Sequence, residues 1–144
     1  MAENPDFDIQ DFVPYLLNQA AEASSLEFQQ LYKDRYGMLR TEWRVLFHLG
    51  LYQRMTAVEI CRKARMHKTK ISRAVQKLAD RRFLQRDRSA EDRRVEYLTL
   101  TPAGQAAYRD LMTAAAAYDA RLMAGFTPAE AALLRQLLRR LAAG

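Results

Sequence analysis

The sequence has few residues that bind metals or carry redox chemistry. Its 144 residues include one cysteine, Cys61, and two histidines, His48 and His67. They form neither a Cys-x-x-Cys nor a His-Glu-x-x-His pattern, so we expect no metal site and no cofactor. One cysteine cannot form an internal disulfide, which fits a reducing compartment. Because Cys61 lies beside Ile60 on the inward side of an expected short helix, we interpret it as a core residue and not as a redox sensor.

Glycine-rich loops and long apolar runs are also missing. The five glycines are scattered, which excludes a phosphate-binding loop, and no arrangement of serine, histidine and acidic residues resembles a catalytic triad. No apolar run approaches the ~20 residues of a membrane helix. The N-terminus carries Glu3, Asp6, Asp8 and Asp11 instead of the basic and then apolar segments of a signal peptide. We therefore predict a cytoplasmic protein that is not an enzyme and has no membrane partner.

Positive charge is abundant and unevenly distributed. Lys and Arg number 23 against 17 Asp and Glu, which gives a net charge of +6 and a pI near 9.7. The segment from Cys61 to Arg94 holds 13 of the 23 basic residues but only 4 of the 17 acidic ones. A pI this high indicates a polyanionic partner, either nucleic acid or an anionic membrane surface. The concentration of the charge in one segment favours nucleic acid.

Hydrophobic spacing and capping residues predict a mainly α-helical chain with a small β-wing. Threonine caps mark three of the helix starts, at Thr56, Thr101 and Thr127. A fourth helix is predicted to begin at Thr41 and to stop near Gly50. The remaining predicted elements are helices over about 12–33 and 68–81 and strands over 83–87 and 95–100.

This order of elements is typical of a winged helix-turn-helix flanked by N- and C-terminal dimerisation helices. We assign residues 1–144 to a single domain. In it, residues 12–33 and 102–143 are the predicted dimerisation helices, and residues 41–100 are the winged helix-turn-helix lobe. The leucine-rich terminal helices need a partner surface to cover their apolar stripes, which supports a homodimer. A two-fold dimer reads two half-sites about one helical turn of DNA apart, roughly 34 Å.

The helix over about 68–81 carries the residues that we expect to contact DNA. Its apolar residues share one face, so the opposite face consists of hydrogen-bond donors. Lys and Arg neutralise phosphates, and they also reach guanine edges in the major groove, where Ser and Thr serve several bases. We expect base contacts from Thr69, Lys70 and Arg73. The full set of outward residues is Lys68, Thr69, Lys70, Ser72, Arg73, Gln76 and Lys77.

The hairpin that follows is predicted to be an arginine-rich wing. Its connection between the strands is too long for a two-residue turn. The candidate DNA-binding residues in it are Arg88, Asp92, Arg93 and Arg94, with Arg86 at the base. We predict that Asp92 holds Arg94 by paired hydrogen bonds, because a held arginine loses less entropy on entering a narrow, electronegative minor groove. The alternative is that these charges only solvate a surface hairpin.

The stretch over residues 55–104 resembles the winged helix-turn-helix of MarR-type transcriptional regulators. The wing in that family has an Asp-x-Arg, here Asp92-Arg93-Arg94, and closes with Leu-Thr-x-x-Gly, here Leu100 to Gly104. The turn before the polar helix departs from the family, since it lacks the common glycine and has His67 where an acidic or hydroxyl cap is usual. The resemblance implies a homodimer that binds a palindromic site near a promoter, usually as a repressor.

The resemblance also implies a small-molecule site. In the family, an apolar cleft between the dimer helices and the DNA-binding lobe often takes a small, aromatic, anionic ligand. Residues 32–48 supply stacking surfaces and cations for an aromatic acid or its thioester. Aromatic residues at helical spacing more often belong to an ordinary core, which is the alternative. The candidate ligand-binding residues are Tyr32, Tyr36, Met38, Arg40, Trp43, Arg44, Phe47 and His48.

These observations predict a regulator of transcription that binds double-stranded DNA with sequence specificity. We expect a homodimeric repressor that a small ligand releases from its palindromic operator. The alternative function is a winged helix that contacts protein or RNA without operator specificity.

Overall fold

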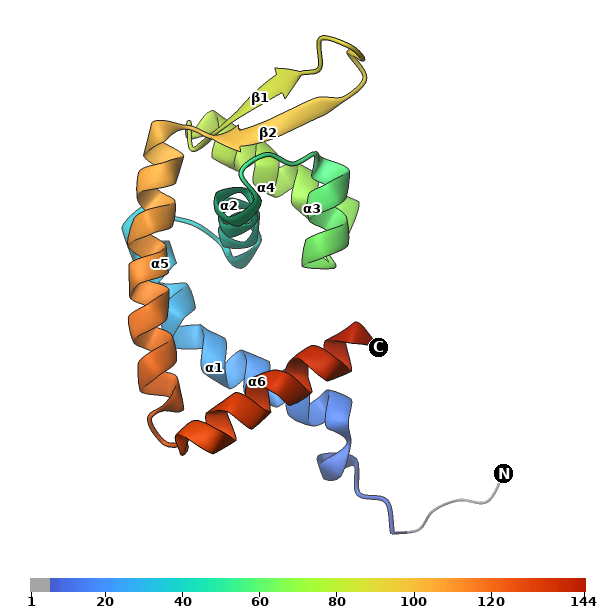
Figure 1. The fold of residues 1–144 in the computed structure, drawn as a ribbon, viewed down its shortest axis with the longest axis vertical. Helices are drawn as coiled ribbons and strands as arrows, with labels where there is room; N and C mark the ends of the chain where they lie inside the picture. Colours follow the sequence, from blue (N-terminus) through green and yellow to red (C-terminus); the bar gives the residue numbers. More distant parts are fainter. Residues whose placement is uncertain (1–5) are drawn as a thin grey trace, which may run out of the picture.

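The structure is a computed structural model that describes residues 6–144. As predicted, it is mainly α-helical with one small antiparallel sheet (Figure 1). In chain order the elements are η1 (Ile9–Asp11), α1 (Val13–Tyr36), α2 (Arg40–Tyr52), α3 (Ala57–Ala64), α4 (Lys68–Asp80), β1 (Leu84–Arg88), β2 (Glu96–Leu100), α5 (Pro102–Met123) and α6 (Pro128–Ala143). In the hairpin, Leu84 pairs with Leu100 and Arg88 pairs with Glu96.

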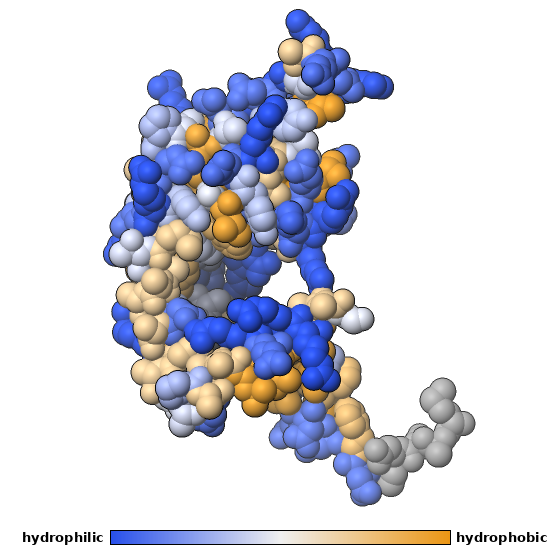
Figure 2. Space-filling model, in the orientation of Figure 1, coloured by the Kyte–Doolittle hydropathy of each residue, from blue (hydrophilic) through white to orange (hydrophobic). Residues whose placement is uncertain are grey.

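The elements form two regions (Figure 1). The lobe consists of α2, α3, α4 and the hairpin, and the arms are α1, α5 and α6. α5 and α1 both extend away from the lobe, and α6 turns back below it from the far end of α5. In the space-filling view of the same orientation, an open space separates the lobe from α6 (Figure 2). The molecule therefore consists of a packed lobe and three arm helices, two of which extend away from it.

The hydrophobic core lies mainly in the lobe. Leu46 of α2, Ile60 of α3, Ile71 of α4 and Leu98 of β2 are each at most 1% exposed. By contrast, Ala131 is the only buried residue of α6. Full burial of a leucine or isoleucine side chain is worth about 1.5–3 kcal/mol. The contacts that stabilise this fold are thus concentrated around the helix-turn-helix.

Threonine caps begin three helices as predicted. The Oγ1 atoms of Thr56, Thr101 and Thr127 each accept a hydrogen bond from the backbone N–H three residues later, at 3.2, 3.0 and 3.1 Å. The prediction for α2 was wrong, because Thr41 lies inside its first turn. There the Glu42 carboxylate accepts a hydrogen bond from the Leu39 N–H at 3.1 Å and caps the helix two residues earlier.

Other predicted boundaries shifted for local backbone reasons. α1 continues to Tyr36 and ends at Gly37, whose φ of 62° lies in the left-handed region that favours glycine. α2 runs past Gly50 to Tyr52 and ends at Gln53, which has a φ of 72° and donates its N–H to the carbonyl of Leu49 at 2.8 Å. β1 lies one residue later than predicted, over 84–88, and β2 begins one residue later but ends as predicted, over 96–100.

Gly104 fixes the join between the hairpin and α5. A Cβ atom at this position would lie 1.9 Å from the carbonyl oxygen of Phe83. That carbonyl accepts a hydrogen bond from the Thr101 N–H at 3.1 Å, and the Thr101 hydroxyl donates to the carbonyl of Arg82 at 2.6 Å. The Leu-Thr-x-x-Gly close is therefore a packing requirement that ties the base of the wing to α5.

Candidate nucleic-acid interface

α4 separates its apolar and polar residues completely. Ile71, Ala74, Val75 and Leu78 are buried, at the spacing of one helical face. All seven predicted DNA-binding residues of this helix are exposed on the remaining surface. α4 therefore presents a continuous polar surface of about three helical turns.

Six of these seven side chains have no partner among the described residues. Only Gln76 is engaged, because its Nε2 donates to Asp80 at 2.7 Å and its Oε1 accepts from Arg86 Nη2 at 2.8 Å. Arg86 also pairs with Glu96 at 3.1 Å, so this network joins α4 to the base of the wing. The other six, of which four are cationic, are Lys68, Thr69, Lys70, Ser72, Arg73 and Lys77. Unpaired cations on one helix face attract an anionic partner.

The turn between α3 and α4 holds its geometry without a glycine. Arg65 adopts the left-handed conformation itself, with φ 54° and ψ 47°. Its Nη2 donates to the carbonyl of Ala142 at 2.6 Å, which links the turn to the end of α6. His67 then caps α4, since its Nδ1 accepts a hydrogen bond from the Thr69 N–H at 3.2 Å.

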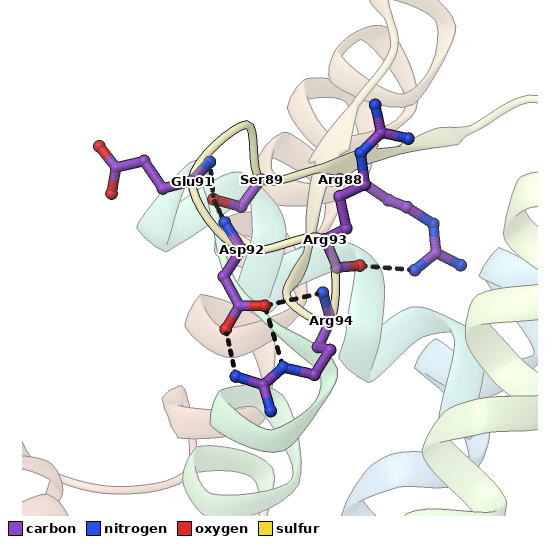
Figure 3. A network of polar contacts seen from close by, with 6 residues as sticks. All are labelled: Arg88, Ser89, Glu91, Asp92, Arg93 and Arg94. Atoms are coloured by element: carbon purple, nitrogen blue, oxygen red, sulfur yellow. Dashed lines mark hydrogen bonds and ion pairs between the residues drawn. The ribbon is translucent and has the colours of Figure 1, made fainter.

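The wing has an ordered tip (Figure 3). As predicted, Asp92 holds Arg94: Nε lies 3.1 Å from Oδ1 and Nη2 lies 3.3 Å from Oδ2. The Arg94 guanidinium lowers the pKa of the Asp92 carboxyl through these bonds. Arg88 donates to the carbonyl of Arg93 at 2.8 Å, and the Ser89 hydroxyl accepts from two backbone N–H groups of the tip. The side chain of Arg94 is still 91% exposed, so it is oriented and accessible at once.

A groove of about 470 Å³ lies between α4 and the start of α2. Three cationic residues of α4 line it, namely Lys70, Arg73 and Lys77, opposite Leu39 and residues 41–42. Sequence reasoning did not include the start of α2 in the interface. The sequence contains no local signal for this part of the groove, because only the packing of α2 against α4 brings the start of α2 to the polar surface.

A second cavity, of about 270 Å³, lies between α1 and α2, away from the polar surface of α4. Four of the eight predicted ligand-binding residues line it: Tyr32, Arg40, Trp43 and Arg44. The rest of the lining comes from α1, through Ala21, Ser24, Ser25 and Phe28, which the sequence prediction did not include. The spacing of Phe28 in the apolar stripe of the first helix was a usable signal for its inward position.

The other four predicted ligand-binding residues lie elsewhere. Met38 is fully buried in the core. His48 is 8% exposed, stacks on Phe47 with ring centroids 4.4 Å apart, and bonds the carbonyl of Arg44 through Nδ1 at 2.6 Å. Tyr36 donates its hydroxyl hydrogen to Asp110 at 2.6 Å. These side chains therefore support the walls of the lobe and do not line the cavity.

Aromatic rings and cations meet at this cavity. Phe28 contacts Trp43 edge to face with centroids 5.3 Å apart, and Tyr32 stacks on Trp43 at 5.8 Å. Arg40 is already paired, with Ser25 Oγ at 3.1 Å and Glu22 at 3.7 Å. Arg44 has no side-chain partner within residues 6–144. Burial raises the pKa of the Tyr32 hydroxyl, so this ring stays neutral. The cavity thus offers apolar rings and one unpaired guanidinium.

The chain has the elements of a winged helix-turn-helix protein, in which α3 and α4 form the helix-turn-helix and β1–β2 the wing. A model of the MarR family matches residues 36–95, from the end of α1 to the tip of the wing. The winged helix-turn-helix of this chain is thus similar to that of MarR-family transcriptional regulators. The wing motif and the Gly104 close that suggested this family from the sequence are both in place.

Solved structures agree along nearly the whole chain. A MarR/EmrR family regulator from Acinetobacter sp. ADP1 is 26% identical with a TM-score of 0.85, covering 95% of this chain and 96% of its own. BpsR from Bordetella bronchiseptica, described as regulated in DNA binding by 6-hydroxynicotinic acid, is 24% identical with a TM-score of 0.83, covering 92% and 99%. A mutant MarR from Escherichia coli, complexed with operator DNA, is 17% identical with a TM-score of 0.82, covering 96% and 99%.

The Acinetobacter protein and a matched protein from Pseudomonas aeruginosa are both described as transcriptional regulators, in agreement with the prediction that the chain is not an enzyme. Comparison with curated proteins gives no significant match. None of the helices within residues 6–144 has the length and hydropathy of a membrane span.

Proposed function

We propose that this regulator is a homodimeric repressor that binds a palindromic operator and is released by a small aromatic anion. The polar surface of α4 carries the first part of this proposal. Four cations of α4 have no partner in the described structure, and the wing presents Arg94 already oriented by Asp92. A helix of this kind fits the major groove, and a held arginine fits the narrow minor groove beside it.

The dimer is proposed from the apolar surface of the arms. Leu133, Leu137 and Leu141 follow one another at four-residue spacing on α6 and are 46–52% exposed. Phe12 and Leu16 at the start of the chain's long first helix are also 43–48% exposed. Apolar stripes on two elements of one region are typical of a protein interface. A second copy that covers them would place two α4 helices for two half-sites.

The repressor is tested by binding to the DNA upstream of its own gene. We expect an electrophoretic shift that survives an excess of unrelated duplex competitor, because base contacts add to the phosphate contacts. The second candidate function, a winged helix for RNA or protein, would give a shift that unrelated duplex or RNA removes equally well. That result would refute operator specificity.

The effector is proposed to bind in the cavity between α1 and α2. Its rings match an aromatic ligand, and the unpaired Arg44 matches a carboxylate. The reported regulation of BpsR by 6-hydroxynicotinic acid is consistent with this chemistry. A ligand wedged here would contact both an arm and the lobe, and would thereby change the spacing of the two α4 helices.

Trp43 provides the readout, because it is the single tryptophan of the chain and lines the cavity. We expect benzoates, cinnamates, hydroxynicotinates or their thioesters to change its fluorescence and to release operator DNA over the same concentration range. Arg44→Met should weaken the effective ligand by roughly 10- to 100-fold, the value of a hydrogen bond to a charged group. Arg109→Met, an exposed arginine of α5, is the matched control. Release of DNA without a change in Trp43 fluorescence would refute this site.

A further inference from the structure

His67 occupies the entrance of α4 in an unusual way. It is the residue immediately before the helix, and its imidazole Nδ1 accepts the hydrogen bond from the Thr69 N–H at 3.2 Å. Its backbone is extended, with φ −66° and ψ 144°, as a capping residue requires. Asp, Asn, Ser and Thr, the usual capping residues, cap helices with a side-chain oxygen. Histidine has a second nitrogen.

The cap determines the hydrogen positions on the ring. A nitrogen that accepts a hydrogen bond carries no hydrogen, so the neutral ring must carry its hydrogen on Nε2. The two nitrogens lie on different sides of the five-membered ring and point away from one another. With Nδ1 directed at the backbone of α4, the Nε2–H is directed outward from the helix.

The surroundings of His67 leave this donor available. Its side chain is exposed, and the cap is its only interaction within the described residues. Its neighbours on the helix are Lys68, Thr69 and Lys70, three of the exposed residues that form the start of the polar surface. No acidic side chain in residues 6–144 bonds the ring and competes for the hydrogen. The donor therefore lies at the end of α4 that points toward DNA in a helix-turn-helix.

We propose that His67 is a DNA-binding residue as well as a helix cap. Its Nδ1 holds the first turn of α4, and its Nε2–H donates to an acceptor on the operator. The inference rests on the proposed operator binding by α4. It assigns to one ring both the positioning of the base-contacting turn and a direct contact.

Three substitutions separate the two roles. His67→Asn keeps an acceptor, Oδ1, near the position of Nδ1, but has no donor at the position of Nε2. His67→Gln places an amide donor at the outer position and loses the short capping geometry. His67→Ala removes both.

The variants are compared by thermal unfolding and by operator affinity from fluorescence anisotropy. We expect His67→Asn to unfold at the wild-type temperature and to bind operator roughly three- to tenfold more weakly, the range for one hydrogen bond. His67→Gln should unfold at a lower temperature and bind more tightly than His67→Ala. Nitrogen-15 chemical shifts of the histidine side chains should show the Nε2–H tautomer for His67 in the free protein. The Nδ1–H tautomer would contradict the cap and overturn the proposal.

The kind of acceptor follows from the operator used. An equal loss for His67→Asn on every operator variant identifies a phosphate, and a loss that disappears when one base pair is changed identifies a base edge. Either result supports the contact. If the wild-type protein binds operator selectively and His67→Asn binds with unchanged affinity, the contact is refuted and the repressor function stands. Absence of selective binding by the wild-type protein would refute both.

Discussion

The lobe and the arms bury their apolar side chains to very different extents. In the lobe, α2 alone contributes Val45, Leu46 and Leu49, all fully buried. In the arms, large apolar residues stay exposed along α1 and α6, among them Leu26 at 60% and Leu133 at 52%. The large apolar side chains of the lobe are therefore mostly buried within one chain, while many of those in the arms are not. This difference supports the proposed dimer, in which a second copy would cover the arms.

The strongest test of this comparison is a charge on the exposed face of α6. Leu137→Glu should convert a dimer into a monomer at micromolar concentration, because an unpaired carboxylate in an apolar interface costs several kcal/mol. Light scattering coupled to size-exclusion chromatography measures the mass. Val58→Glu, at a position of α3 that is 65% exposed in the lobe, is the matched control and should leave the mass unchanged. A mass of two chains for Leu137→Glu would contradict the proposal that this face of α6 is covered by a second copy.

Cavity-forming substitutions should affect stability differently in the lobe and in α6. Leu46→Ala in the core of the lobe should lower the free energy of unfolding by about 2–5 kcal/mol at every protein concentration. Leu138→Ala in α6, where the side chain is 43% exposed, should lower it only at concentrations at which the dimer forms. Urea unfolding at two protein concentrations distinguishes these outcomes. An equal loss for Leu138→Ala at both concentrations would mean that α6 is stabilised within one chain.

The sequence predicted three helix starts and the polar surface of α4 well because their signals are local. The caps at Thr56, Thr101 and Thr127 lie within three residues of the groups they bind, and the apolar spacing of α4 defines its outward face. The start of α2 was missed because Thr41 is a favoured capping residue and Leu39 is not, whereas in the structure the Glu42 side chain caps the Leu39 N–H.

The cavity was predicted only in part because it depends on how α1 packs against α2. Arg40, Trp43 and Arg44 come from the predicted segment, whereas Ser25 and Phe28 reach the cavity from a helix whose angle no local pattern fixes. His48 carries the same chemistry as a ligand-binding residue, yet it is buried against Phe47. Residue types therefore predicted which segment contributes to the cavity, but tertiary packing determines which of its side chains line it.

Within the lobe, the exposed and unpaired Arg73 should contribute to base recognition. Arg73→Ala should weaken operator binding by about 1–3 kcal/mol and relax the preference at one base pair. Arg109→Ala removes the same charge from an arm and should have a much smaller effect that disappears at high salt. Anisotropy titrations on operator variants measure both. If Arg73→Ala weakens binding equally on all sequences, Arg73 contacts phosphate and not a base.

At the wing, net charge and side-chain geometry predict opposite changes in DNA affinity. Asp92→Ala removes a negative charge, so electrostatics alone would tighten DNA binding. We expect binding to weaken by roughly two- to fivefold instead, because Arg94 loses the carboxylate that orients it at 3.1 Å. The measurement is operator affinity at two salt concentrations, with Asp87→Ala in β1 as the control. Tighter binding by Asp92→Ala would show that the wing acts through charge alone.

The smallest expected effect concerns the contact between two arm helices, α1 and α5. Asp110 of α5 accepts hydrogen bonds from Tyr36 at 2.6 Å and from Arg35 at 3.1 Å, and both donors lie at the end of α1. Hydrogen bonds from Tyr36 and Arg35 lower the pKa of the Asp110 carboxyl. Burial, together with the bond to Asp110, raises the pKa of Tyr36 to about 12.

These two pKa shifts predict opposite pH dependences for the stability that the contact between α1 and α5 provides. A lowered carboxyl pKa stabilises the fold above the ordinary value near 3.9, and this contribution is lost as the pH falls through the folded-state value. A raised tyrosine pKa stabilises the fold below about 10, and this contribution is lost as the pH rises toward about 12. Asp110→Asn should therefore lower the unfolding temperature slightly at pH 7, and the difference from wild type should shrink as the pH falls below about 4. Because Arg35 and Asp110 are 47% and 42% exposed, added salt should also reduce the difference. A constant difference from pH 3 to pH 7 would show that Asp110 contributes through packing and not through its charge.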